Sequence, residues 1–191
     1  MSRVRGGAVA VAAAASIAAG ALAVGRAAPS GGGGCIAGPI PSHTCTPGLL
    51  NPAIHQSNIK TTICKGGWTA TVRPTQTVTN HLKAEAAERY GISPFDPTKY
   101  EGDHLISLEL GGALASIKNL WDEPHTAVGP DGKDAGSFVK DAFENYLNFR
   151  VCRAKARLTL RQAQHMIRGD WYAAYIAAGR PKDPYNHHHG G

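Results

Sequence analysis

The sequence of residues 101–121 is EGDHLISLELGGALASIKNLW, and it is the most informative stretch of the chain. Its apolar run is typical of a strand, and the pair Gly111-Gly112 ends that run. A turn follows, and Asn119-Leu120-Trp121 is expected to lie on the next strand. The stretch therefore predicts two short strands joined by a turn.

An acid, an imidazole and an amide occur within this stretch, at Asp103, His104 and Asn119. Neighbouring strand residues point to opposite faces, so Asp103 and His104 can act together if the strand bends or ends there. A carboxylate oxygen can then hold a hard divalent cation while a neutral imidazole takes a proton from water. The Asn119 amide can fix the orientation of the ring. These residue types favour metal-assisted hydrolysis.

Elements around this stretch are predicted from apolar periodicity and from helix-capping residues. Thr69–Arg73 alternates small or apolar with polar side chains, so we expect a short edge strand there. Helices are expected at residues 80–90, 138–151, 160–168 and 171–178, the third opened by a capping box of Thr159 and Gln162. The last third of the chain is thus expected to be helical, and the fold class is α+β.

The segment from 101 to 121 resembles the HNH branch of the His-Me finger nucleases. The core of that family has an Asp-His or His-His pair, an apolar stretch, Gly-Gly and then Asn-Leu. The wider chain looks like secreted bacterial members of the same family. The resemblance implies a small ββα-metal core with additional helices, in which a β-hairpin and one helix hold a single divalent metal. It also implies cleavage of phosphodiester bonds with a histidine as general base.

Transferred residue by residue, the resemblance implies that Asp103 is a metal ligand and His104 the general base. Asn119 would position that base, and Gly111 and Gly112 would shape the loop. These roles make His104 and Asn119 the expected catalytic pair.

The third metal ligand of the family, a His or Asn of the following helix, has no clear match in this chain. We expect His125 to supply it, with Asp131, Asp134 and Asp141 as alternatives. Mg²⁺ is the expected cofactor of a site with Asp and Asn, while a histidine ligand leaves Mn²⁺, Ni²⁺ or Zn²⁺ open.

The four cysteines, Cys35, Cys45, Cys64 and Cys152, indicate disulfides in an exported chain. Their spacing contains no C-x-x-C pair of the kind that structural zinc sites use. Three pairings are open, and we favour Cys35–Cys45, which closes a short Pro- and Gly-rich segment, with Cys64–Cys152. The fold is therefore expected to be braced by disulfides.

The N-terminus has the layout of a secretory signal peptide, with Arg3 and Arg5 before an Ala- and Val-rich run and small residues after it. We expect cleavage near Ala23, although an uncleaved anchor is the alternative, and no later stretch has the length of a membrane span. The expected domains are a signal peptide at 1–23, a flexible leader at 24–50, an HNH-like domain at 51–180 and a disordered tail at 181–191. The chain is expected to be secreted, with no stable membrane insertion after cleavage.

The chain has 20 Lys and Arg against 14 Asp and Glu, a net charge of +6 with no dense basic tract, which does not by itself indicate nucleic-acid binding. The expected function is that of a secreted metal-dependent endonuclease with DNA or RNA as substrate. The alternative is a non-catalytic secreted module of the same fold that binds polyanions or a cell-surface partner, which the unmatched third ligand favours. The oligomeric state is open.

Overall fold

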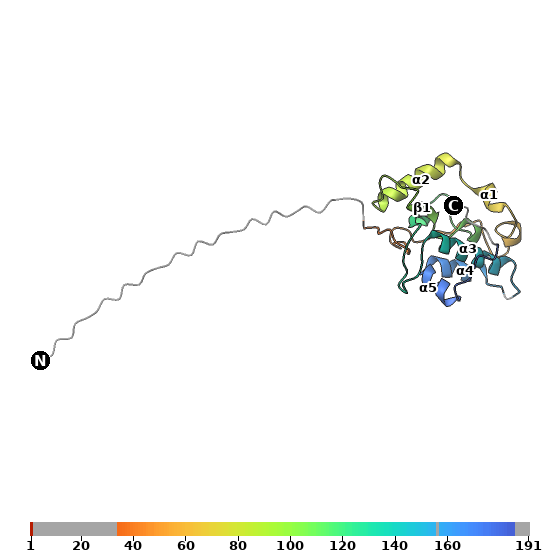
Figure 1. The fold of residues 1–191 in the computed structure, drawn as a ribbon. Coiled ribbons are helices and arrows are strands. Elements are labelled where there is room, and N and C mark those ends of the chain that lie inside the picture. The colour runs from red at the N-terminus through yellow and green to blue at the C-terminus, as the bar shows by residue number, and fades with distance from the viewer. Residues whose placement is uncertain (2–33, 156, 186–191) are drawn as a thin grey trace. The chain divides into compact units, whose positions relative to one another are not determined.

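The computed structural model describes residues 1, 34–155 and 157–185, and apart from Met1 these belong to the unit Gly31–Gly191 (Figure 1). The expected signal peptide at 1–23 therefore lies outside the described residues, Met1 apart. The described part combines helices with a two-stranded antiparallel sheet, which confirms the α+β class. In chain order the elements are α1 (Trp68–Val72), α2 (Gln76–Arg89), β1 (Tyr100–His104), β2 (Leu120–Pro124), α3 (Ser137–Cys152), α4 (Leu160–Arg168) and α5 (Trp171–Ala177).

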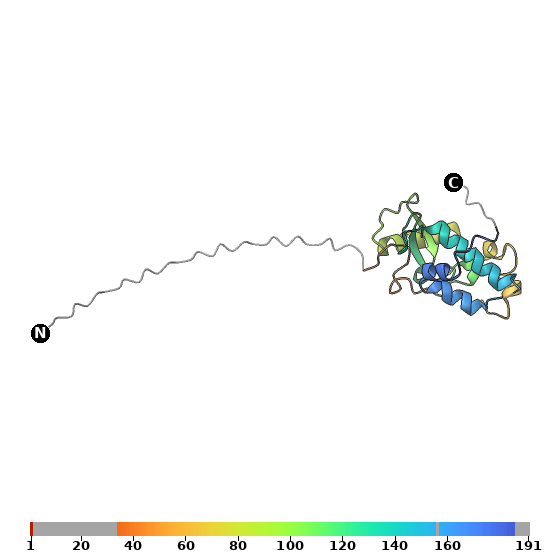
Figure 2. The same cartoon turned by 60° about the horizontal axis from the view of Figure 1, so that its bottom comes forward.

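Strands β1 and β2 form a hairpin in which Asp103 pairs with Trp121 and Glu101 with Glu123. Side chains alternate between the two faces of this hairpin. Helix α2 contacts both strands on one face, and the approach is so close that a Cβ atom at Gly102 would lie 2.7 Å from Cγ of Lys83. On the other face, Lys140 of α3 bonds to Asp103. The hairpin is thus held between α2 and α3 (Figures 1 and 2).

Two strand predictions were wrong. Thr69–Arg73 lies mostly in the short helix α1, which follows Gly67 in the left-handed region at φ 76°. The apolar run after His104 is not a strand either, because β1 ends there and Leu108–Leu110 forms a 3-10 turn. Most side chains of this run are buried without alternation, and a buried turn cannot be distinguished from a buried strand by periodicity.

The helix predictions were confirmed with small shifts at the ends. Helix α2 begins at Gln76, four residues before the expected start, because Thr75 and not Asn80 is the N-cap whose side chain accepts from the Val78 amide. Helix α4 begins with the predicted capping box, in which Thr159 and Gln162 bond to each other's backbone amides. Helices α3 and α5 lie at the expected positions. None of the described helices is both long and apolar enough to cross a membrane.

The main core lies between α3, α4 and α5. Phe143 and Leu147 of α3, Ile167 of α4 and Trp171 of α5 have no exposed surface. Leu110, from the segment that joins the two strands, belongs to the same buried cluster. Because that segment is anchored in the core, the end of β1 and the start of β2 are held in fixed positions.

Both ends of the folded unit extend beyond the expected bounds of 51 and 180. Trp171 Nε1 donates to the Pro39 carbonyl at 2.6 Å, and the fully buried Thr46 donates to the Leu120 carbonyl at 2.9 Å. At the other end, the Tyr185 hydroxyl lies 2.8 Å from Asn148 Oδ1. Residues 35–50 and 181–185 are therefore part of the fold, while 186–191 lie outside the described residues.

The two disulfides connect Cys35 to Cys45 and Cys64 to Cys152, as predicted. The second joins cysteines 88 residues apart and ties the segment before α1 to the C-terminal end of α3. A crosslink over a longer segment removes more conformational entropy from the unfolded chain. Cys64–Cys152 is therefore the more stabilising of the two.

We expect replacement of Cys64 and Cys152 by Ala to lower the free energy of unfolding by about 4 kcal/mol, and replacement of Cys35 and Cys45 by about 3 kcal/mol. The difference follows from separations of 88 and 10 residues. Urea unfolding of both double variants and of the oxidised parent measures the two losses. A larger loss for the Cys35–Cys45 pair would contradict this ranking.

Candidate functional site

A cavity of about 350 Å³ lies beside the end of β1. Its walls come from α1 and α2, from β1, from the segment between the strands and from α3. Both Asp103 and His104 line this one cavity, because β1 ends at His104. This is the condition under which the sequence analysis expected the two side chains to act together. The other ionisable side chains around it are Arg73, Lys83, Glu101, Glu109, Asp141 and Glu144.

The His104 imidazole is fixed by one backbone contact. Its Nε2 lies 3.2 Å from the Leu114 carbonyl oxygen. A carbonyl can only accept, so Nε2 holds the proton of the neutral ring and Nδ1 keeps its lone pair. Burial lowers the pKa of His104 below its ordinary value of 6.5, against the opposing effect of Asp103. At neutral pH this ring is therefore uncharged.

Asn119 determines the shape of the segment that supplies the Leu114 carbonyl. Its fully buried amide donates to the carbonyls of Ile106 at 3.0 Å and Ala113 at 3.2 Å. Its Oδ1 accepts from the Ile106 amide at 3.0 Å. These bonds join both ends of the segment 106–113. Asn119 therefore acts on the imidazole through the backbone, whereas the sequence analysis placed its amide on the ring.

Gly112 explains why a glycine pair belongs to this arrangement. A Cβ atom there would lie 1.8 Å from the Ile106 carbonyl oxygen and 2.7 Å from Asn119 Nδ2. Gly111 precedes it in the left-handed region at φ 76°, where side chains other than glycine are strained. The two glycines let the chain turn back over Asn119.

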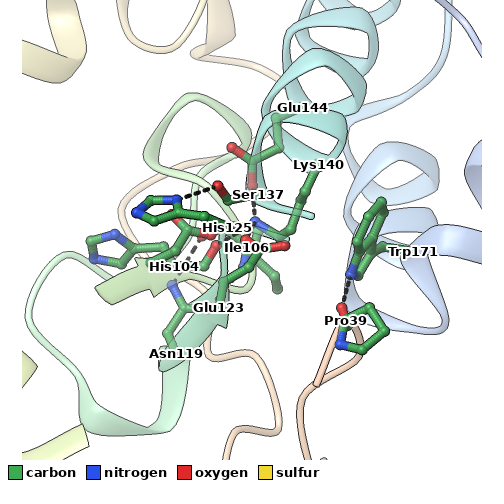
Figure 3. A network of polar contacts seen from close by, with 11 residues as sticks. Pro39, His104, Ile106, Asn119, Glu123, His125, Ser137, Lys140, Glu144 and Trp171 are labelled. Carbon is green, nitrogen blue, oxygen red and sulfur yellow. Dashed lines mark hydrogen bonds and ion pairs between the residues drawn. The ribbon is translucent and has the colours of Figure 1, made fainter. Parts of the chain in front are cut away.

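Asp103 forms an ion pair with a residue that the sequence analysis did not select. Lys140 Nζ lies 2.5 Å from Asp103 Oδ2 and 3.0 Å from the His104 carbonyl oxygen. It also bonds to Glu144 Oε1, one turn further along α3, and lies 3.9 Å from Glu123 Oε2. Figure 3 shows Lys140 and Glu144 projecting from α3 towards the hairpin.

The Lys140 side chain has no exposed surface. Burial alone lowers the pKa of an amine, but the carboxylates of Asp103, Glu144 and Glu123 raise the pKa of Lys140 well above its ordinary value. Lys140 is therefore an ammonium ion inside the protein. Burying an unpaired charge costs much free energy, so the ammonium can be buried here only because these oxygen atoms surround it.

The sequence contained a signal for this cluster. Lys140 and Glu144 lie four residues apart, on the same side of α3 as Phe143, Leu147 and Val151. All five positions are buried. A Lys and a Glu within the apolar stripe of an amphipathic helix indicate a buried ion pair that needs a further partner.

His125 does not lie with Asp103. It follows β2, whose last residue pairs with Tyr100, so it is roughly 13 Å along the hairpin from Asp103. Its Nδ1 lies 2.9 Å from Ser137 Oγ and its Nε2 3.1 Å from the Pro97 carbonyl oxygen. Both ring nitrogens thus have partners outside the cavity.

The alternative ligands are placed differently from one another. Asp131 pairs with Arg180 and accepts from the Tyr172 hydroxyl, and Asp134 accepts from the Gly136 amide. Asp141 lines the cavity that contains Asp103.

The expected metal centre of Asp103 and His125 does not fit this arrangement. Within residues 34–155 and 157–185, no group of three or more His, Cys, Asp and Glu side chains is arranged to hold a metal ion. One of the two carboxylate oxygens of Asp103, Oδ2, is in contact with the Lys140 ammonium. The residues present therefore form a charge-paired cluster and not a metal-ligand set.

Comparisons of the chain with protein-family models, with curated proteins and with solved structures found no match.

We expect Asn119→Ala to lower the free energy of unfolding by about 3 kcal/mol. The substitution leaves the backbone N–H of Ile106 and the carbonyls of Ile106 and Ala113 without their hydrogen-bond partner. The matched control is Asn80→Ala on the exposed side of α2, which should change stability by about 0.5 kcal/mol or less. Urea unfolding of both variants measures the difference. Similar losses would contradict the structural role assigned to Asn119.

Proposed function

We propose that this chain is a phosphodiester hydrolase that cuts DNA or RNA internally, with His104 as general base. The observation that supports this best is the fixed imidazole at the cavity. Its Nε2 is bonded to the Leu114 carbonyl, its Nδ1 keeps a lone pair, and burial keeps it neutral near pH 7. A base with these properties can take a proton from a water molecule in the cavity.

The order of elements also supports the proposal. A β-hairpin followed by a helix is the arrangement that the resemblance to the HNH branch implies, and here β1, β2 and α3 follow in that order. The Asp103-His104 pair lies at the end of β1, and Asn119 and the two glycines shape the connecting segment. We propose that this hairpin and helix form a core of the ββα type.

The proposed reaction consumes one water molecule. Water gives a proton to Nδ1 of His104 as its oxygen bonds to phosphorus. The bond from phosphorus to the leaving oxygen breaks, and that oxygen keeps the electron pair and takes a proton from solvent. The imidazolium then returns its proton to solvent. The products are a phosphomonoester and a free hydroxyl group.

Arg73 and Lys83 are the proposed contacts to the phosphate. Both line the cavity with His104, Arg73 at the C-terminal end of α1 and Lys83 within α2. Cations at the rim attract a polyanion and oppose the charge that builds on phosphate oxygens. Arg150 in the last turn of α3 and Arg153 just after that helix are not proposed as phosphate contacts, because they lie against the rings of Tyr146 and Tyr185.

We propose that the protein works outside the cell. Two disulfides and no unpaired cysteine among the described residues suit an oxidising compartment. The signal-peptide pattern at the N-terminus supports the same location.

We expect the oxidised chain to nick supercoiled plasmid and His104→Ala to lose at least about 100-fold in rate, since removal of a general base costs that much or more. His125→Ala is the matched control, because this histidine lies outside the cavity, and it should keep most of the activity. Gel analysis of the plasmid, with circular dichroism to verify folding, measures both. Equal and negligible cutting by parent and His104→Ala would favour the non-catalytic polyanion-binding module, which retention on heparin would then test.

The rate should fall on the acid side of its pH profile as His104 takes up a proton. Burial lowers the pKa of His104 below 6.5, the ordinary pKa of an imidazole. The midpoint of the acid limb, where half of the activity is lost, should therefore lie below pH 6.5. A profile of kcat/KM against pH measures this midpoint, with the folded state verified at each pH. An acid limb centred above pH 6.5 would argue against His104 as the base.

A further inference from the structure

The ammonium of Lys140 is surrounded by oxygens in the way a bound metal cation would be. Its three bonded oxygens come from two parts of the fold: Asp103 Oδ2 and the His104 carbonyl belong to β1, and Glu144 Oε1 belongs to α3. Glu123 Oε2, from β2, lies 3.9 Å away. Carboxylate and backbone carbonyl oxygens are also the ligands that hard divalent cations prefer.

We propose that the Lys140 ammonium is the resident cation of this site and takes the place of a divalent metal ion. The site is then complete without metal. That Lys140 occupies the cation position does not depend on the proposed function. That the site cuts phosphodiesters without a metal ion does rest on it.

The position of Lys140 leaves no room for a second cation on Asp103 Oδ2. A divalent ion bound to Asp103 Oδ2 would lie about 2.0 to 2.6 Å from that oxygen, which is already 2.5 Å from Nζ. Two cations on one carboxylate oxygen repel each other strongly at this depth. The lysine cannot move away either, because its side chain is fully buried and α3 is anchored by Phe143 and Leu147.

The ammonium also explains how β1 ends. It bonds to the side chain of Asp103 and to the backbone carbonyl of His104, the residue whose imidazole is the proposed base. Because Lys140 is fully buried, it does not reach a substrate in the cavity. It is a positioning residue, and it acts on the imidazole by fixing the backbone that holds it.

The experiment compares the oxidised chain with Lys140→Met, which keeps a similar shape and removes the charge. Thermal unfolding is measured in EDTA and in excess Mn²⁺. The parent should melt at the same temperature in both. Lys140→Met should melt at a lower temperature in EDTA and gain about 5 °C or more in Mn²⁺, because the oxygens left without a cation now bind the metal.

Lys133→Met is the matched control, because Lys133 is exposed in the turn before α3. Its melting temperature should be the same with and without Mn²⁺. A Lys140→Met protein that folds but does not respond to Mn²⁺ would overturn the inference, since its oxygens would then not form a cation site.

A second measurement decides the inference if Lys140→Met does not fold. Electron paramagnetic resonance follows free Mn²⁺ as the parent chain and Asp103→Asn are added. We expect no saturable Mn²⁺ site in the parent that depends on Asp103. One Mn²⁺ bound per chain, lost in Asp103→Asn, would overturn the inference.

Plasmid cutting separates this inference from the proposed function. Cutting that depends on His104 and is equal in EDTA and Mg²⁺ supports both. Cutting that depends on His104 but stops in EDTA keeps the hydrolase and overturns the resident ammonium. If the parent cuts under no condition, the proposed function fails, and the melting and Mn²⁺-binding results still decide which cation occupies the site.

Discussion

The ion pair between Lys140 and Asp103 is the interaction on which the site depends. It connects the first turn of α3 to the next-to-last residue of β1, and its members come from distant parts of the sequence. A buried ammonium without its oxygens would be far less stable than the paired one, so α3 and the hairpin must hold one relative position. The free-energy cost of an unpaired buried charge therefore favours one position of α3 relative to the hairpin.

The segment between the two strands fixes the orientation of the His104 imidazole. Asn119 bonds to both ends of the segment, and Gly112 allows the Ile106 carbonyl to come close. Leu114 then presents its carbonyl to His104. The Asn119 side chain thus shapes the backbone of the segment, and a backbone carbonyl in turn orients the ring.

The sequence predicted the parts of this structure that local rules decide. Caps and apolar spacing located α3, α4 and α5, and the cysteine count with its short first spacing gave the disulfide pairing. The segments at 69–73 and 105–110 were predicted wrongly because their conformation depends on burial against distant elements. His125 was chosen for its nearness to Asn119 in sequence, and the register of the hairpin places it at the far end. Lys140 was missed because a lysine on an amphipathic helix is usually solvated.

The alternation of β1 separates the charges of the site in a way that suits the polyanionic substrate proposed above. Asp103 and Glu101 lie on the face of the hairpin that meets α3, where the Lys140 ammonium balances negative charge. Gly102 and His104 alternate to the other face, where Lys83 of α2 packs against Gly102. In the proposed function, a phosphate that approaches from the side of α2 meets the His104 imidazole and the Lys83 ammonium. Asp103 and His104 therefore lie on opposite faces of β1 and still line one cavity.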